Sequence, residues 1–277
     1  MATAAVDRSV TRVNSNHDEL CGSPEWAAYL QEEVLPTVTA GVDLGQVMLE
    51  IGPGPGAATG WLCQRVRQLA ALERDEPAAA ALAAKFPRVQ VTVGDAARMS
   101  YPDCSFDSVG SFTMLHHVPT TTLQNQILAE ALRVLRPGGV LVGSDSLPSN
   151  ELHQFHEGDT CHPVEPAALL VRQQTLGFAA VMVAVDDGLT FTARKAELPG
   201  GSCGVAAPGH AAWADAPGAR RTLSGKRAER QRRGAEREVR VSDETPGQFA
   251  PEPGGTKLLV VHADSGQAPA YQIVRLP

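Results

Sequence analysis

The chain has 277 residues, a formal net charge of −7 and 43% hydrophobic residues, which is typical of one or two globular domains. It holds no run of about eighteen apolar residues, so the sequence predicts no membrane-spanning helix. Residues 1–8 lack a basic start followed by an apolar core, and the five cysteines are scattered without paired spacing. These features disfavour a secretory signal, a disulfide framework and a zinc site, and they predict a cytoplasmic protein.

The N-terminal segment changes character at Ser23. Residues 1–22 are polar and aperiodic, so we expect a disordered N-terminus there. Ser23 and Pro24 form a typical helix start, and a stripe at helical spacing follows, formed by Trp26, Tyr29, Leu30 and Val34. This stripe favours a helix packed on the domain, and the alternative is a lid whose aromatic side chains touch substrate.

The middle of the chain alternates between strand and helix patterns. Strands are predicted at residues 47–51, 68–72, 88–93, 106–112 and 140–145, with helices at 60–66, 77–86 and 123–135 between them. A helix at 166–176, ended by Gly177, then precedes two strands, 178–185 and 189–195, joined by Asp186-Asp187-Gly188. The sequence therefore predicts an α/β fold: a doubly wound, seven-stranded, mostly parallel sheet with a C-terminal antiparallel hairpin.

The first strand ends in Glu50 and leads into a loop with glycine at positions 52, 54 and 56. Glycine lets a backbone approach a ligand closely, and the helix that follows would point its N-terminal amides at the bound group. Glu50 favours a ligand that carries ammonium or hydroxyl donors. The alternative for such a loop is a tight turn without a ligand.

Five segments of the chain resemble sequence motifs of a known family and occur in the same order. The segments are residues 50–56, Glu73, and residues 94–96, 101–109 and 133–139. Together they resemble the motifs of the class I S-adenosylmethionine-dependent methyltransferases, and the likeness is nearest to the small-molecule "type 11" branch. The terminal hairpin also fits the sheet of this family.

The resemblance implies S-adenosyl-L-methionine as the cofactor and assigns roles to the residues. Gly52, Gly54 and Gly56 would pack against the methionine part, and Glu50 would shape the loop and the ammonium site. Glu73 would accept hydrogen bonds from both ribose hydroxyls. Toward the adenine, Asp95 would accept from the amino group and the Ala96 amide would donate to a ring nitrogen, while Ser111 would lie near the sulfonium.

A competing interpretation is an NAD-dependent oxidoreductase. Gly52, Gly54 and Ala57 match a dinucleotide fingerprint, and Glu73 lies near the distance expected for a ribose acid. Pro53 and Pro55 disfavour it, because proline lacks the amide that a pyrophosphate would use. The non-enzyme alternative is a cofactor-binding regulator or an inactive homologue.

Histidines mark the acceptor side of the predicted site. His116 and His117 follow the fourth strand, so either is a candidate general base, although packing or capping is the more ordinary role. After the fifth strand, His153 and His156 are candidates for substrate binding, with Asp159, Cys161 and His162 close by. Their spacing matches no standard metal site, so we predict no metal.

The last segment, residues 198–277, is rich in glycine, proline and arginine, which predicts a largely disordered tail. Residues 219–240 hold nine basic and three acidic residues, against 15 basic and 28 acidic elsewhere. The acidic body disfavours a nucleic-acid groove, and the basic run is either a solvated tail, which we favour, or an RNA-binding or acid-binding segment. A third hypothesis is that the tail is dispensable or a frameshift product.

We therefore predict three parts: residues 1–22 as a disordered N-terminus, 23–197 as a methyltransferase domain with an N-terminal helix, and 198–277 as the tail. The predicted activity is methyl transfer from S-adenosyl-L-methionine to a carbon, oxygen or nitrogen atom of a small molecule. The predicted partners include neither membrane nor nucleic acid.

Overall fold

The computed structural model describes residues 14–186, 188–197, 257–262 and 270–275. They belong to one compact unit, formed by Met1–Cys203 and Gly254–Pro277, and the second unit, Gly204–Pro253, lies outside the described residues. The predictions for residues 1–13, and for the tail except its two strands, also fall outside them. Among the described helices, none is long and apolar enough to cross a membrane.

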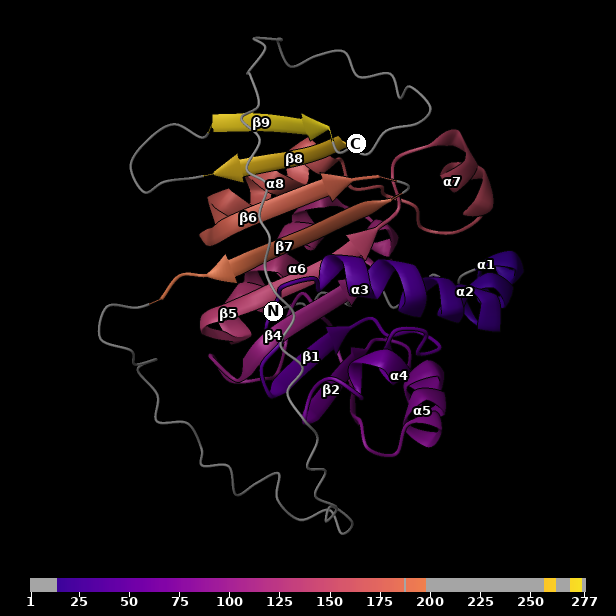
Figure 1. Cartoon of the computed structure of the whole chain (residues 1–277). Coiled ribbons are helices and arrows are strands. Elements are labelled where there is room, and N and C mark those ends of the chain that lie inside the picture. The colour runs from indigo at the N-terminus through magenta and orange to yellow at the C-terminus, as the bar shows by residue number, and fades with distance from the viewer. Residues whose placement is uncertain (1–13, 187, 198–256, 263–269, 276–277) are drawn as a thin grey trace, which may run out of the picture. The chain divides into compact units, whose positions relative to one another are not determined.

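A mixed sheet in the order β3-β2-β1-β4-β5-β7-β6-β8-β9 forms the centre of the fold (Figure 1). Neighbours from β3 to β5 are parallel, whereas every pair from β5–β7 onward is antiparallel. The strands are β1 Val47–Ile51, β2 Gln68–Glu73, β3 Gln90–Val93, β4 Phe106–Phe112, β5 Leu135–Asp145, β6 Phe178–Val185, β7 Leu189–Lys195, β8 Lys257–His262 and β9 Ala270–Arg275. The predicted seven-stranded sheet with its terminal hairpin is confirmed as β1–β7, and β8 and β9 continue it beyond the prediction.

Helices cover both faces of the sheet because successive strand residues point to opposite sides. Met48 packs into one buried cluster with α3 Leu35–Val38, α4 Thr59–Leu62 and α5 Glu76–Lys85. The next residue, Leu49, packs into the other cluster, with α6 Thr121–Val134 and α8 Pro166–Leu176. The doubly wound arrangement thus follows from central strands that are buried on both faces.

Local capping signals fix where the helices begin and end. The Thr120 hydroxyl accepts from the amide of Leu123 at the start of α6, and Asp75 caps α5 in the same way through Ala78. Gly177 ends α8 in a left-handed conformation with φ of +100°. The end of α8 matches the prediction, and α6 begins two residues earlier than predicted.

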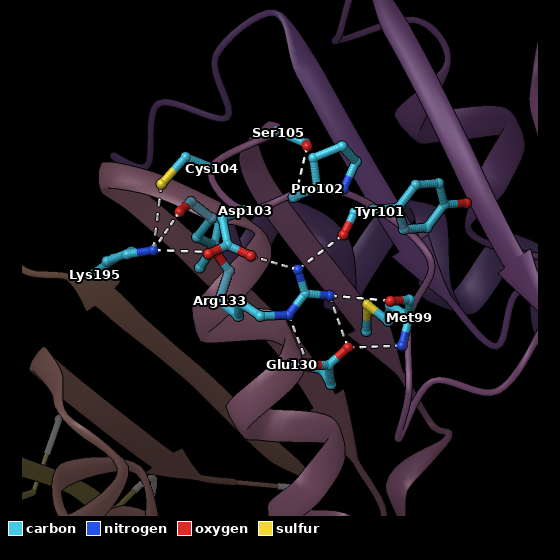
Figure 2. Close-up of polar contacts among 10 residues, drawn as sticks. Met99, Tyr101, Pro102, Asp103, Cys104, Ser105, Glu130, Arg133 and Lys195 are labelled. Atoms are coloured by element: carbon cyan, nitrogen blue, oxygen red, sulfur yellow. Dashed lines mark hydrogen bonds and ion pairs between the residues drawn. The ribbon is translucent and has the colours of Figure 1, made fainter. Parts of the chain in front are cut away.

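An ion-pair network centred on Arg133 fastens the end of α6 to the segment before β4 (Figure 2). The guanidinium donates to both carboxylate oxygens of Glu130 at 2.8 Å and to the carbonyl oxygens of Met99 and Tyr101. It also reaches Asp103 at 2.7 Å. Two of the motif segments, 101–109 and 133–139, are therefore joined by structural contacts rather than by a ligand.

The N-terminal segment is helical where the described residues begin. Residues 15–21, predicted as disordered, form α1 Ser15–Cys21, and the predicted helix after Ser23 runs through α2 Pro24–Tyr29, η1 Leu30–Val34 and α3. No residue of α2 is buried, and Tyr29 is 42% exposed. Leu30 of the predicted stripe is buried, and Leu35 adds a further buried contact. The predicted packing of the stripe is therefore observed at Leu30, whereas Tyr29 takes no part in it.

The cysteines only partly follow the prediction. Cys63 and Cys161 are free thiols. Cys104, however, is disulfide-bonded, so the expectation of unpaired cysteines is wrong at that position.

Candidate functional site

The glycine loop between β1 and α4 is built on three left-handed glycines. Gly52, Gly54 and Gly56 have φ of +62°, +50° and +83°. A Cβ at Gly52 would approach Cγ of Met114 to 2.3 Å, whereas a Cβ at Gly54 would meet no atom within 4 Å. Gly52 therefore serves close packing, and Gly54 leaves backbone open to a ligand.

Glu50 ties the end of β1 to the helix after this loop. Its side chain is buried, with the residue 2% exposed, and it accepts a hydrogen bond of 2.7 Å from the Thr59 hydroxyl of α4. Burial raises the pKa of Glu50 to about 7; the Thr59 bond opposes this rise and the charge of Glu73 adds to it. An ammonium group arriving beside Glu50 would stabilise its charged form.

Glu73, at the end of β2, lies against the same loop. One carboxylate oxygen accepts from the Gly54 amide at 3.2 Å, and the other accepts from the amides of Arg74 and Asp75 at 2.7 and 3.0 Å. The side chain is only partly buried. The acid and the glycine loop thus form one hydrogen-bonded unit that is open to a ligand.

The remaining predicted cofactor residues lie at the same edge of the sheet. Strand pairing sets Ile51 beside both Leu72 and Ser111. Asp95 follows β3, is exposed, and accepts from the amide of Ala97 at 2.9 Å, with partly buried Ala96 between them. Ser111 is buried, and its hydroxyl has no hydrogen-bond partner among the described residues. The edge formed by the carboxyl ends of parallel strands is where open α/β sheets bind ligands.

The N-terminal helices reach this loop as well. Gln31 of η1 donates from its side-chain amide to the carbonyl oxygen of Ala57 at 2.8 Å. Trp26 and Tyr29 lie one turn earlier, with ring centres 5.6 Å apart. The Gln31 contact packs the N-terminal helices against the glycine loop, and a lid whose aromatic side chains touch substrate stays a prediction.

A buried histidine–aspartate pair lies at the ends of β4 and β5. His116 belongs to η2, Leu115–His117, directly after β4, and Asp145 is the last residue of β5. His116 Nδ1 and Asp145 Oδ1 are 2.5 Å apart, and both residues are 3% exposed. The same carboxylate oxygen accepts from the Ser146 amide at 2.8 Å. Such a carboxylate holds the proton on Nδ1 and leaves Nε2 as the proton acceptor.

Three further histidines gather beside this pair. The ring centres of His17 and His117 are 4.5 Å apart, and His156 lies 5.1 Å from each. Burial and the neighbouring histidine charges lower the pKa of His117 to about 2, and burial also lowers the pKa of His156. We refer to His17, His117 and His156 as the histidine cluster.

The two predicted substrate residues, His153 and His156, lie on and just after the helix α7, Asn150–Phe155. His153 lies on α7 and is exposed, whereas His156 follows the helix and is 3% exposed. Only His156 joins the cluster, so the two histidines do not share a face toward the site. His162 is not part of the histidine cluster. Its Nε2 lies 3.0 Å from the hydroxyl of Thr121.

Two residues of this region, His17 and Asp145, were not predicted from the sequence. Asp145 could have been found, because it ends a predicted strand at the ligand edge. His17 carried no such signal, since it approaches the cluster only through α1.

Comparison with known proteins identifies the central part of this chain. Residues 49–143 match the model of a methyltransferase domain. This segment is a methyltransferase domain. The segment runs from β1 to within β5, so it contains the glycine loop, Glu73 and His116. The resemblance to the S-adenosylmethionine-dependent methyltransferases is thereby confirmed.

Relatives of this methyltransferase domain carry matching names. A Mycolicibacterium smegmatis protein named as a probable S-adenosylmethionine-dependent methyltransferase is 36% identical over 36% of this chain and 38% of its own length. Phthiotriol/phenolphthiotriol dimycocerosates methyltransferase 1 of Mycobacterium ulcerans is 32% identical over 49% of this chain and 38% of its own. The chain thus spans less than half of these relatives.

A solved structure agrees on the fold of the methyltransferase domain. Phosphoethanolamine N-methyltransferase 2 of Haemonchus contortus, in complex with S-adenosyl-L-methionine, has a TM-score of 0.52 at 16% identity. The match covers 62% of this chain and 56% of that one. At 16% identity, this similarity shows only that the two proteins share a fold.

Proposed function

We propose that this chain is an S-adenosyl-L-methionine-dependent methyltransferase that methylates a small molecule. The observation that carries the proposal is the unit formed by Gly54, Glu73 and buried Glu50 within a methyltransferase domain. Glu50 and the open backbone at Gly54 suit the amino-acid end of the cofactor, and Glu73 suits a pair of hydroxyls. Asp95, Ala96 and Ser111 extend the same edge toward the adenine and the sulfonium.

The acceptor is proposed to be a molecule with a protonated nucleophile, such as a hydroxyl group. A sulfonium is already a good leaving group, so the protein chiefly aligns the nucleophile and excludes water. A base is needed only if the nucleophile carries a proton. His116, with Nδ1 bonded to Asp145, is the base we propose, and Nε2 would accept the proton as the methyl transfers.

Calorimetric titration with S-adenosylhomocysteine tests the cofactor part, with NAD as the competing ligand. We expect saturable 1:1 binding of S-adenosylhomocysteine and none of NAD. Glu73→Ala should weaken binding by on the order of tenfold or more, because a buried pair of ligand hydroxyls loses its acceptor. The exposed Glu151→Ala serves as the matched control. Binding of NAD alone would instead support the oxidoreductase alternative.

Acceptor screening tests the activity itself. The protein would be incubated with S-adenosyl-L-methionine and candidate hydroxylated small molecules, and the release of S-adenosylhomocysteine would be measured. Cofactor binding without turnover of any acceptor class would favour the non-catalytic alternative.

A further inference from the structure

We propose that His17, His117 and His156 bind a divalent transition metal of the zinc class and leave one coordination position open. The three rings come from α1, η2 and the residue after α7, which are far apart in sequence. Their candidate ligand atoms all lie within 4.8 Å of one another. No other group among the described residues meets this criterion.

The spacing of the rings is close to what such a metal requires. Around tetrahedral zinc, with Zn–N bonds of about 2 Å, the ligand nitrogens lie roughly 3.3 Å apart and the imidazole centres about 5 Å apart. The observed centre-to-centre distances are 4.5, 5.1 and 5.1 Å. The candidate ligand atoms lie within 4.8 Å of one another, so binding a metal requires the nitrogens to approach each other by up to about 1.5 Å.

In two of the three rings, those of His156 and His117, one nitrogen is directed by a hydrogen bond to a backbone group. His156 Nδ1 lies 2.8 Å from the carbonyl oxygen of Leu152, while its Nε2 is buried and has no hydrogen-bond partner among the described residues. The His117 ring is hydrogen-bonded to the backbone of Thr160. His17 Nδ1 lies 3.9 Å from Asp159 Oδ2. Metal-binding histidines are oriented in this way, with one nitrogen held by a carbonyl or carboxylate and the other facing the metal.

The local charges would balance a dication. Asp159 is almost fully buried, with a side-chain exposure of 2%, and holds the start of α1 by accepting from the Asn14 amide at 2.7 Å. Asp145 is equally buried on the other side, next to His116. Three neutral imidazoles bring no charge, so these two carboxylates can offset a divalent ion in an otherwise apolar interior.

The type and number of the ligands indicate which metal would bind and whether its role would be catalytic or structural. An all-imidazole set suits zinc, iron(II), nickel or copper and disfavours magnesium and calcium. Three protein ligands with an open fourth position are typical of catalytic rather than structural zinc. His116 lies beside the cluster, with its ring centre 4.0 Å from that of His117. If the proposed function holds, the open position would bind an oxygen of the acceptor next to the proposed base.

Cobalt(II) is the probe for the first experiment. The full chain, purified without a histidine tag and stripped with a chelator, would be titrated with Co²⁺ while visible absorption is recorded. We expect saturation at one equivalent with the strong d–d bands of a four-coordinate site, and displacement by Zn²⁺. A thiolate-to-cobalt charge-transfer band would instead implicate a cysteine such as Cys161 and overturn the all-histidine assignment.

Three variants and one matched control locate the site. His17→Ala, His117→Ala and His156→Ala should each weaken Zn²⁺ binding by on the order of 100-fold or more. His153→Ala removes an exposed histidine three residues from His156 and should leave Zn²⁺ affinity unchanged. His156→Gln keeps more of the buried volume, so it provides a second test if His156→Ala unfolds. Circular dichroism of each variant reports folding.

Absence of saturable binding, or binding that survives the cluster variants, would overturn the proposal. Titration with S-adenosylhomocysteine on the same samples separates this inference from the proposed function. Cofactor binding without metal binding would refute the metal site alone, and the reverse result would refute the proposed methyltransferase activity alone.

Discussion

The charge state of Glu50 makes a prediction that can be measured without knowing the acceptor. Glu50→Gln keeps an oxygen that can accept from Thr59 but removes the ionisable group. The wild-type pKa of Glu50 is raised from 4.5 to about 7 because the side chain is buried. Between these values the folded protein holds a proton that the unfolded chain has released. The free energy of unfolding should therefore fall as the pH rises through this window and level off above it.

The size of the effect follows from the two pKa values. The difference between 4.5 and about 7 corresponds to about 3 kcal/mol. Glu50→Gln resembles the protonated side chain at every pH, so its stability should approach that of the wild type only below pH 4.5, where the unfolded wild-type chain also holds the proton. Above pH 7 it should be more stable than the wild type by up to that amount.

Urea denaturation followed by circular dichroism between pH 5 and pH 8 gives this difference directly. Comparing the two proteins at each pH cancels the titration of every group other than Glu50. Glu76→Gln, at an exposed carboxylate on α5, controls for the loss of one negative charge. A stability difference that stays constant within about 0.5 kcal/mol across this range would refute the argument from burial.

The same variant tests the proposed cofactor role. If the cofactor's ammonium pairs with Glu50, wild-type affinity for S-adenosylhomocysteine should increase from pH 6 to pH 8, and binding should release a proton below pH 7. Glu50→Gln should lose both the pH dependence and at least about tenfold in affinity at pH 8. Equal affinity of the two proteins at pH 8 would contradict this role.

Three other predictions concern the base, the network and the loop. Asp145→Asn should lower kcat for methyl transfer by on the order of 100-fold, because His116 loses its orientation, while calorimetry should find S-adenosylhomocysteine affinity nearly unchanged. Arg133→Ala should cost about 2 kcal/mol in urea unfolding, since it removes the contacts of the Arg133 guanidinium drawn in Figure 2, and an equal stability would show that these contacts contribute nothing. Gly52→Ala should lower the thermal midpoint, at a cost of roughly 1–3 kcal/mol, because alanine would be strained at φ of +62° and would press on Met114; an unchanged midpoint would argue against this loop conformation.

The strands and the cofactor side could be predicted because their signals are local. Each strand is an apolar run bounded by glycine, proline or charged residues, and the bond from Thr59 to Glu50 spans only nine positions. Glu73 and Gly54 are 19 positions apart and belong to consecutive elements. Motif spacing therefore carries the geometry of this half of the site.

Other elements were missed for equally physical reasons. The helix α7 has six residues and no buried one, so it shows no apolar periodicity. Strands β8 and β9 come after a long glycine- and proline-rich segment, and β8 pairs with β6 across more than 70 positions. The residues next to a strand in the sequence do not show that it pairs with a strand so far away, so this pairing could not be predicted.

The proposed acceptor side of the site is assembled differently from the proposed cofactor side. Its residues come from α1, η2, the end of β5 and the segment after α7, and the bond between Asn14 and Asp159 spans 145 positions. Three of these contributions, α1, Asp145 at the end of β5 and the residues from α7 to Asp159, lie outside the matched methyltransferase domain, 49–143. A domain that binds one cofactor can therefore serve different acceptors when the added helices change. It follows that exchanging α1 or α7 should alter acceptor choice and metal affinity while leaving S-adenosylhomocysteine binding intact, and loss of cofactor binding in such a chimaera would contradict this division of the site.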